Sequence, residues 1–578
     1  MSITVALGMV LASWLTVGAS CVGWGTLLMR LLLPQATSPM KLQNLFWAGF
    51  SMLIGLLHVW HFFLPIDWRA TIALICGGVI IGLLLGSFRI SLPEKIGRAL
   101  LFSLLALWLA YRGLDFPQNY DSGLYHFASI RWINEFPVVP GLANLHERLG
   151  FNQGHFLFVA LLNVHPYFGE GYHVAGSLLW FVLTAPMLAA SLTLLRNHRP
   201  ASRAVITQCL LLPIALAHAL GGDISSPTPD FAVFAIGIAA FVMLVQKLEI
   251  IRDDEPSHRS STLILSMLLA TGCTMKLSFA LFGVTVASVL LFSDWNQYSS
   301  PKQGKTKWVL LTLSGAFLFW GIPGALHSIV LSGYPAFPST LLAWPVDWRL
   351  PLTEAQATAD WVRSWARTPG MHYREVLSSW SWLGPWWQRT SALPGVYLPL
   401  LFTALGGLGF GVAWWRPRTR AYSANTGGWR LPFVPVIGGL IFWFFTAPDP
   451  RFASWLLWLL AVWTLACVVQ VVANAHDAVW ARVLAGVSIA SAVGVIILGI
   501  SVWWRPGRYG FDSLPRVVTT KFVTQSGLTI ILPVNNQEVR LWDTPLPSAP
   551  LAKPNLEMRG SDFSRGFRTS LPPPAPAE

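Results

Sequence analysis

The sequence has few charged residues and few cysteines. Only 11% of its 578 residues are Asp, Glu, Lys or Arg, against roughly a quarter in an ordinary soluble domain. All five cysteines lie inside apolar stretches and none forms a CxxC pair, which argues against a disulfide framework or a zinc site. Internal repeats of fixed period are also lacking. This composition excludes an ordinary soluble domain.

Long apolar runs dominate what is present. Hydrophobic residues make up 54% of the chain, and runs of about twenty residues, long enough to cross a hydrocarbon core, recur from end to end. The first run continues for about thirty residues with no Lys or Arg before it, which favours a spanning helix over a cleaved signal peptide. We therefore expect an all-α polytopic membrane protein with about fourteen transmembrane helices.

The basic residues set the expected orientation. The net charge is +13, but most Lys and Arg lie in short loops between apolar runs, so membrane lipids rather than nucleic acid are the expected partner. By the positive-inside rule these loops face the cytoplasm. The transmembrane domain is expected to cover residues 1–504, with large outer loops at 112–170 and 332–394. Residues 505–578 form an outer appendage with strand character at Gly527–Val534 and a disordered, Pro-rich tail.

The first outer loop is rich in groups that can do chemistry. Between Tyr111 and Phe156 it carries acidic, basic and imidazole side chains, namely Asp115, Asp121, Glu135, Glu147, Arg131, Arg148, His126, His146 and His155. The second outer loop is rich in tryptophan, and TEAQATADWVRSWAR within it predicts a helix lying in the headgroup layer. An aromatic belt alone would explain most of these tryptophans.

Two cations are expected on the same outer face. The apolar run 262–292 has cytoplasmic flanks at both ends, so it should be a hairpin with its tip near Thr274–Lys276. A lysine inside an apolar run is costly and usually functional; the alternative is one long tilted helix with a snorkelling lysine. Arg451 lies in a second outer turn, where two prolines interrupt an apolar stretch.

Carboxylates beside cations at a membrane surface suit a substrate with an anionic, lipid-attached leaving group. A carboxylate can act as a general base on an acceptor hydroxyl or amine, and cations can neutralise the departing phosphate. The outer loops contain no DxD motif, so neither a metal nor another cofactor is expected. Asp223 and Asp230 could still contribute to a divalent metal site, although Asp230 could simply cap the next helix.

The run YDSGLYHFASIRWINEFPVVPGLANLHERLGFNQGHF resembles the first outer loop of C-type (GT-C) glycosyltransferases, which use polyprenyl-phosphate sugars. Lipid A aminoarabinose transferases and protein O-mannosyltransferases are the most similar members in pattern. Asp121 stands at the acidic position of that family, Tyr125 at its tyrosine, and Arg131 in its amphipathic helix. The resemblance implies that Asp121 is the catalytic base and that Lys276 and Arg451 bind the donor phosphate.

The sequence departs from this family at several points. Ser122 stands where a second acidic residue is common, and three spans rather than one precede the helix that leads into the loop. The Lys-Pro-Pro-like segment lacks its lysine, for which Arg148 or His146 could substitute. The loop is also similar to that of uncharacterised bacterial inner-membrane proteins.

The expected activity is that of an inverting glycosyltransferase in a bacterial cytoplasmic membrane, with its active site on the periplasmic face. It would pass a sugar from a polyprenyl-phosphate donor to a glycolipid, polysaccharide or protein such as pilin. Asp121 is the first candidate base, with Asp115 and Glu135 as alternatives. The candidate substrate-binding residues are Lys276, Arg451, Tyr125, His126, Arg131, His146, Arg148 and Asn152.

Two other functions fit parts of the pattern. An O-antigen ligase or polymerase would share the basic outer pocket but depend more on an outer Arg or His than on a carboxylate. A lipid-linked sugar transporter or flippase would place ionisable groups at the bilayer midplane, on broken helices in related halves of the chain. The clustering of polar groups at one face favours the enzyme.

Overall fold

The computed structural model describes residues 2–34, 40–88, 96–163, 170–196, 202–249, 255–296, 304–414, 428–475, 479–503, 514–534 and 538–570. The first half contains α1 (Ile3–Leu32), α2 (Leu42–His61), α3 (Trp68–Ala70), α4 (Gly77–Leu84), α5 (Ile96–Gly113), α6 (Phe127–Glu135), α7 (Leu142–Leu145), α8 (Gly154–Leu162), α9 (Tyr172–Arg196), α10 (Arg203–His218) and α11 (Pro229–Glu249). The second half contains α12 (Glu255–Met275), α13 (Ala280–Asn296), α14 (Gly304–Ala316), α15 (Ile322–Ser332), α16 (Leu352–Arg367), α17 (Tyr373–Leu377), α18 (Leu383–Ser391), α19 (Pro394–Trp414), α21 (Phe433–Thr446), α22 (Pro450–Ala475) and α23 (Val479–Trp503). Four short strands follow, β1 (Thr519–Val523), β2 (Thr529–Pro533), β3 (Leu556–Met558) and β4 (Phe567–Thr569).

The helices form a bundle of membrane-spanning length. Within the described residues, ten helices are long and apolar enough to cross a membrane, and three shorter apolar helices cover Trp68–Leu84, Arg203–His218 and Phe433–Thr446. The protein is therefore a multi-pass α-helical membrane protein. The expected number of about fourteen crossings stays a prediction.

The bundle is built around α11, which is apolar on all sides and almost completely buried. Helices of this kind belong in the interior of a bundle. Elsewhere, glycine allows helices to approach closely: a Cβ on Gly25 of α1 would lie 2.0 Å from the Leu45 carbonyl oxygen of α2. Small residues at such contacts are typical of helix packing in membranes, where dispersion forces rather than the hydrophobic effect hold helices together.

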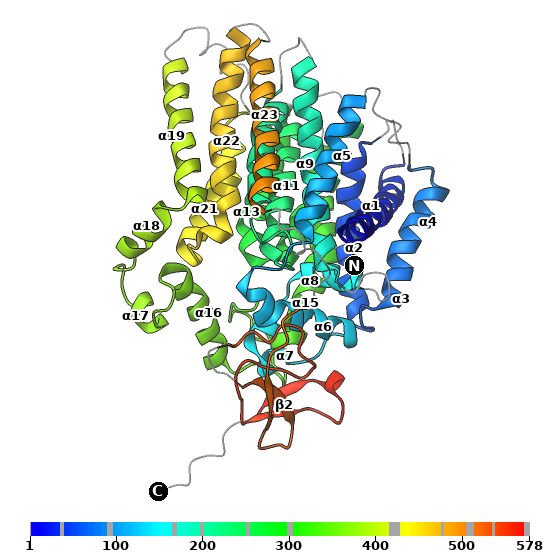
Figure 1. The fold of residues 1–578 in the computed structure, drawn as a ribbon, viewed down its shortest axis with the longest axis vertical. Helices are drawn as coiled ribbons and strands as arrows, with labels where there is room; N and C mark the ends of the chain where they lie inside the picture. The colour runs from blue at the N-terminus through cyan, green and yellow to red at the C-terminus, as the bar shows by residue number, and fades with distance from the viewer. Residues whose placement is uncertain are drawn as a thin grey trace.

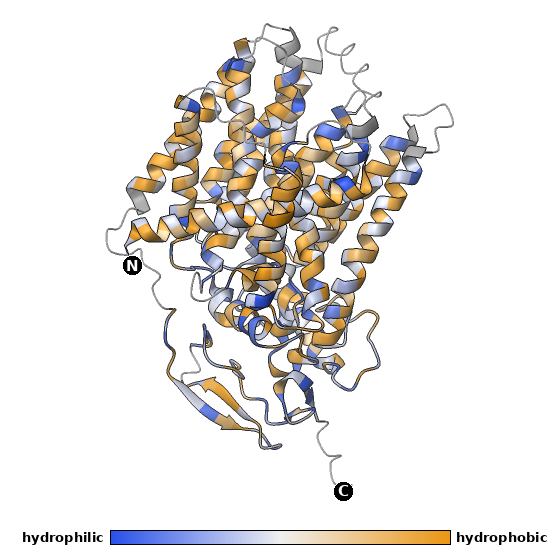
Figure 2. Ribbon diagram, turned by 90° about the vertical axis from the view of Figure 1, so that its right-hand side faces the viewer, coloured by the Kyte–Doolittle hydropathy of each residue, from blue (hydrophilic) through white to orange (hydrophobic). Residues whose placement is uncertain are grey.

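Both large loops gather at one end of the bundle. Figure 1 shows α6, α7, α16 and the strands together at the lower end, below the long helices. In Figure 2 the long helices are mainly hydrophobic, and hydrophilic segments are more frequent in the loops and strands of the lower part. The two loops that were expected to share a face of the membrane therefore lie side by side.

The apolar run 262–292 is broken, as the hairpin prediction requires. Helix α12 ends at Met275, Lys276 has an extended backbone with φ −159° and ψ 134°, and a 3₁₀ turn at Leu277–Phe279 leads into α13. The single tilted helix with a snorkelling lysine is therefore wrong. Lys276 lies at the junction between two helices.

Residues 514–570, here called the C-terminal lobe, consist of two antiparallel hairpins, β1–β2 and β3–β4. Strand β2 falls within the stretch predicted to have strand character. The lobe packs onto the first outer loop: Trp542 N–H donates to the Gly123 carbonyl at 2.9 Å, and Phe567 N–H donates to the Pro140 carbonyl at 2.9 Å. Several of its side chains belong to the main hydrophobic core, so the appendage packs over the first outer loop and covers it. The predicted disordered tail at 571–578 lies outside the described residues.

Candidate functional site

Four charged side chains from four distant segments meet at the loop-bearing end of the bundle. Arg451 Nη1 lies 3.2 Å from Asp121 Oδ2, and Arg451 Nε lies 3.4 Å from Asp230 Oδ2. Lys276 Nζ pairs with the other oxygen of Asp230. The result is an alternating row of carboxylate, guanidinium, carboxylate and ammonium, here called the open charge cluster.

Asp121 stands where the chain enters the helical part of the first loop. Its backbone N–H donates to Asn119 Oδ1 at 3.0 Å, and it immediately precedes a π-helical turn, Ser122–His126, that continues into α6. Such turns are frequent at functional sites because they change which side chains face one side of a helix. Here Asp121, Tyr125 and His126 all line the same cavity.

The first turn of α22 positions Arg451, and the junction between α12 and α13 positions Lys276. Arg451 lies in the first turn of α22, where its N–H donates to Asp449 Oδ1 at 2.9 Å. Lys276 Nζ lies 3.8 Å from the centre of the Phe452 ring, and Arg451 Cζ lies 4.9 Å from the same ring. Both contacts are within the range of cation–π attraction, so one aromatic ring supports both cations.

Asp230 is the member of the cluster that the sequence analysis did not recognise. It lies in the first turn of α11, and its N–H donates to Thr228 Oγ1 at 3.3 Å. Its carboxylate is shared by Lys276 and Arg451. The sequence did contain a signal for this pairing. Asp230 lies at the outer end of a span, on the same expected face as two cations that had no assigned partner.

The cluster forms one wall of a cavity of about 480 Å³, a size typical of small-ligand sites. The polar wall comprises Asp121, Tyr125, His126, Arg148, Asn152, Gln153, Asp230, Lys276, Asp449 and Arg451. The remaining lining residues are mainly apolar and come from α16, α21 and the start of the second outer loop, namely Phe337, Pro338, Ala359, Val362, Trp365, Ala366 and Phe442, with Arg363 of α16 as a charged exception. The cavity therefore suits a ligand with a charged head and an apolar tail.

Electrostatics keep Asp121 ionised and His126 neutral. Burial alone would raise the pKa of the Asp121 carboxyl, but the attraction of Arg451 and of more distant cations outweighs it, so this pKa lies below its ordinary value. Burial lowers the pKa of His126 to about 3, more than its neighbouring carboxylates raise it. At neutral pH the site thus holds a carboxylate anion beside an uncharged imidazole.

Seven of the residues proposed from the sequence line this cavity. They are Asp121, Tyr125, His126, Arg148, Asn152, Lys276 and Arg451. Arg148 Cζ lies 5.8 Å from the centre of the Tyr125 ring, and Asn152 Nδ2 donates to the Gly324 carbonyl at 2.6 Å. The geometry thus assembles most of the predicted set, with Asp230 and Asp449 as additions.

Four proposed residues lie elsewhere. Asp115 pairs with the buried Arg112 at 3.1 Å and accepts from the Phe116 N–H, contacts that suit a structural role. Arg131 and Glu135 pair with each other at 2.7 Å and line a different cavity, between α6 and the C-terminal lobe. His146 is buried, and its Nε2 atom lies 3.8 Å from Glu147 Oε1. It does not line the cavity beside the open charge cluster.

The described residues contain no group of three or more His, Cys, Asp or Glu side chains arranged to hold a metal ion. In the open charge cluster, Arg451 pairs with both Asp121 and Asp230. The positive charge between these carboxylates is therefore supplied by the protein itself.

The bundle and its cavity define a multi-pass membrane protein with a charged cavity at one end of its helices. The chain belongs to a family described as a domain of unknown function (DUF8201), whose profile matches residues 8–458. This match includes every member of the open charge cluster. No curated protein and no solved structure matches the chain.

Proposed function

We propose that this protein is a glycosyltransferase that moves a sugar from a polyprenyl-phosphate donor to an extracytoplasmic acceptor. One observation carries the proposal: a single cavity combines an ionised carboxylate, four cationic side chains, among them Lys276 and Arg451, and many apolar lining residues. A lipid-linked sugar phosphate has complementary parts, because its phosphate is anionic, its sugar is polar and its chain is apolar.

The donor phosphate is proposed to bind at Lys276 and Arg451. Both cations are paired with carboxylates, and a phosphate offers them several acceptor oxygens in charge-assisted hydrogen bonds. The lipid chain would lie against the apolar wall formed by Val362, Trp365 and Phe442. In this proposed arrangement the bond between sugar and phosphate would lie beside Asp121.

Asp121 is proposed to act as the general base. It takes the proton of the acceptor hydroxyl while the acceptor oxygen attacks the anomeric carbon from the face opposite the phosphate. The bond from this carbon to the phosphate oxygen then breaks, and the lipid phosphate leaves with the electron pair, held by Lys276 and Arg451. As Arg451 turns to the phosphate, its attraction for Asp121 weakens, so the pKa of the carboxyl rises and it becomes a better base.

The proposed location is a bacterial cytoplasmic membrane, with the cavity on the outer face and about fourteen membrane crossings. Glycolipids, polysaccharides and proteins remain the candidate acceptors. The position of the charges supports an enzyme over a transporter, because the open charge cluster lies at the loop-bearing end of the bundle, where a transporter would place its ionisable groups near the midplane.

The test is donor cleavage by the purified protein in lipid nanodiscs with a panel of labelled polyprenyl-phosphate sugars. We expect wild type to release polyprenyl phosphate and Asp121→Asn to do so about 10²–10⁴ times more slowly, the usual loss when a general base is removed. Asp543→Asn is the matched control and should retain activity, because Asp543 pairs with the partly exposed Arg131 outside this cavity. Equal rates for wild type and Asp121→Asn would contradict the role of Asp121. Binding of polyprenyl phosphate without cleavage of any donor would favour transport.

A further inference from the structure

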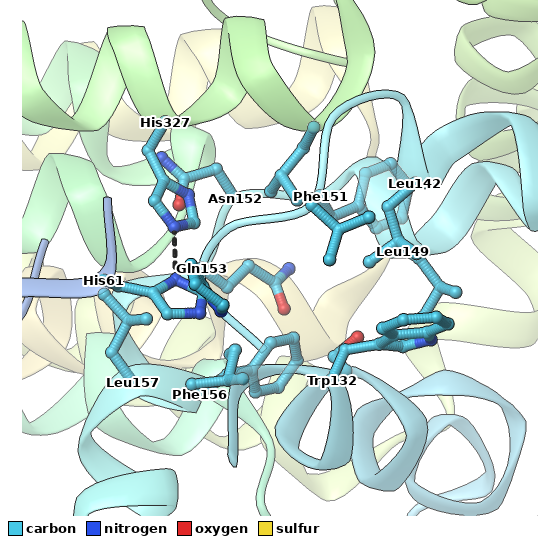
Figure 3. Close-up of a pocket in the computed structure, with 15 residues that line it drawn as sticks. His61, Trp132, Leu142, Leu149, Phe151, Asn152, Gln153, Phe156, Leu157 and His327 are labelled. Carbon is cyan, nitrogen blue, oxygen red and sulfur yellow. Dashed lines mark hydrogen bonds between the residues drawn. The ribbon is translucent and has the colours of Figure 1, made fainter. Parts of the chain in front are cut away.

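A second, smaller cavity of about 30 Å³ lies directly behind the candidate site. Its wall includes Phe151, Asn152 and Gln153, which also line the larger cavity of the candidate site. Figure 3 shows His61 and His327 at one side, Trp132 at the other, and Gln153 between them. The two cavities are therefore separated by one short stretch of the first outer loop.

Polar atoms in this wall lack hydrogen-bond partners within the described part of the chain. They are the Ser129 hydroxyl, Trp132 Nε1 and Gln153 Oε1. Ser129 is 7% exposed and Trp132 is 2% exposed, so bulk water does not solvate them. An unpaired buried polar group costs about 1–3 kcal/mol, and such groups are rare in native proteins. Three around one cavity call for a common partner.

The histidine pair adds a fourth such atom. His61 Nε2 lies 3.1 Å from the Phe136 carbonyl, which can only accept, so this nitrogen carries the hydrogen. In a neutral pair His61 Nδ1 is then the acceptor, and it takes the hydrogen bond of 2.8 Å from His327 Nε2, drawn in Figure 3. This leaves His327 Nδ1 as an acceptor without a partner among the described residues.

The four atoms are complementary to water. Trp132 Nε1 can only donate, Gln153 Oε1 and His327 Nδ1 can only accept, and the Ser129 hydroxyl can do either. A cavity of 30 Å³ has room for about two water molecules, and buried water needs two to four polar partners. We propose that this cavity is an internal hydration site in which bound water links the His61–His327 pair and Trp132 to the Gln153 side chain.

The site has a consequence for the candidate cavity. Gln153 lines both cavities, and water bound at its Oε1 fixes which end of the amide faces inward. The inner wall of the candidate site is then held by a hydrogen-bonded network that ends at His61 and the Phe136 carbonyl. Gln153 is thereby a positioned polar group of the candidate site, a role that holds whatever ligand the site binds.

The test compares two serines whose hydroxyls both lack partners among the described residues. Ser129 lines the small cavity, and Ser51, which is also buried and lies on α2, does not. In a hydrated cavity Ser129→Ala removes a bond to water, so we expect the melting temperature of the full-length protein in nanodiscs to fall by about 1–3 °C. Ser51→Ala removes an unpaired hydroxyl, so its melting temperature should stay the same or rise.

A double-mutant cycle with Gln153→Met completes the test. Because a bridging water contacts both side chains, the loss of stability in the Ser129→Ala/Gln153→Met double variant should be smaller than the sum of the losses in the two single variants. A rise in melting temperature for Ser129→Ala would show a dry cavity and overturn the proposal. Equal falls for Ser129→Ala and Ser51→Ala would overturn it as well, as would strict additivity in the cycle.

Discussion

The same helices carry a second charge cluster at their other end. Lys247 in the last turn of α11, His258 on α12 and Asp294 on α13 form a closed charge cluster, in which Lys247 Nζ lies 2.6 Å from His258 Nε2 and His258 Nε2 lies 3.1 Å from Asp294 Oδ1. The side chains of Lys247 and Asp294 are 2% and 1% exposed, against 19% and 11% for Lys276 and Asp230. One Lys–Asp pair is sealed between helices, and the other faces a cavity.

The comparison separates a structural ion pair from a candidate binding site. Both pairs use the same chemistry on the same helices. The open charge cluster also contains Arg451 and a second carboxylate, and it lines a space of ligand size. A sealed pair can exchange partners only if the helices move. An open pair can release a cation to an incoming anion, because water and ligand reach it directly.

The largest expected effect is on folding. Asp294→Asn removes the buried carboxylate that Lys247 and His258 share, so we expect the free energy of unfolding to fall by about 3–5 kcal/mol. Asp230→Asn, the matched change in the open charge cluster, should cost less than half as much, because Arg451 keeps Asp121 and Lys276 gains water. Denaturation in detergent, followed by tryptophan fluorescence, measures both. Equal losses would mean that the open cluster is as structural as the closed one.

The next largest effect should be on ligand binding, and here the lysine of the open charge cluster is compared with the lysine of the closed charge cluster. Lys276→Met should weaken binding of polyprenyl phosphate about tenfold to a hundredfold, the usual range for one lost hydrogen bond to a charged group. Lys247→Met should leave the affinity unchanged, because Lys247 lies at the far end of α11. Titration calorimetry in nanodiscs distinguishes them. A parallel loss in both variants would point to a general loss of the fold.

Acid should destabilise the loop-bearing end. Burial lowers the pKa of His126 to about 3 and those of His146 and His155 to about 4. Below the ordinary histidine pKa of about 6.5 the unfolded chain binds protons that the folded chain does not, so stability falls as pH drops from about 6.5 towards 4. Thermal unfolding across this range measures the loss. His126→Asn should make the fall shallower, and an unchanged pH dependence in that variant would contradict this account.

The smallest effect should come from a charge outside both clusters. Arg131 pairs with Glu135 and Asp543 at the partly exposed junction with the C-terminal lobe. Arg131→Gln should lower stability by no more than about 1 kcal/mol, as for most exposed ion pairs, and leave donor cleavage unchanged. Melting temperature and the cleavage assay check both parts. A large loss of cleavage would return Arg131 to the site that its sequence position suggested.

Much of the fold follows from local patterns in the sequence. Runs of apolar residues predicted the spanning helices, and the cytoplasmic flanks at both ends of the run 262–292 predicted the break between α12 and α13. Both patterns follow from the membrane environment, because unpaired backbone groups and isolated charges are unfavourable inside a lipid bilayer.

The candidate site was predicted less completely because its contacts join distant parts of the chain. Asp121 and Arg451 are 330 residues apart, and no local periodicity indicates that they meet. Asp230 was assigned a possible cap because a carboxylate in a first helical turn fits that role equally well. Arg131 was included because it stands in the amphipathic helix of the resemblance, and Glu135 because it lies in the same loop as Asp121. Both line the cavity between α6 and the C-terminal lobe instead.

The attachment of the C-terminal lobe has a consequence for how the protein is made. Trp542 bonds to Gly123, and Arg131 bonds to Asp543, 412 residues further along the chain. The first outer loop is synthesised early, yet its cover and its partner Arg451 are synthesised much later. The candidate site therefore cannot be assembled before Arg451 on α22 has been synthesised, and a chain that stops before the lobe carries its charged loop uncovered.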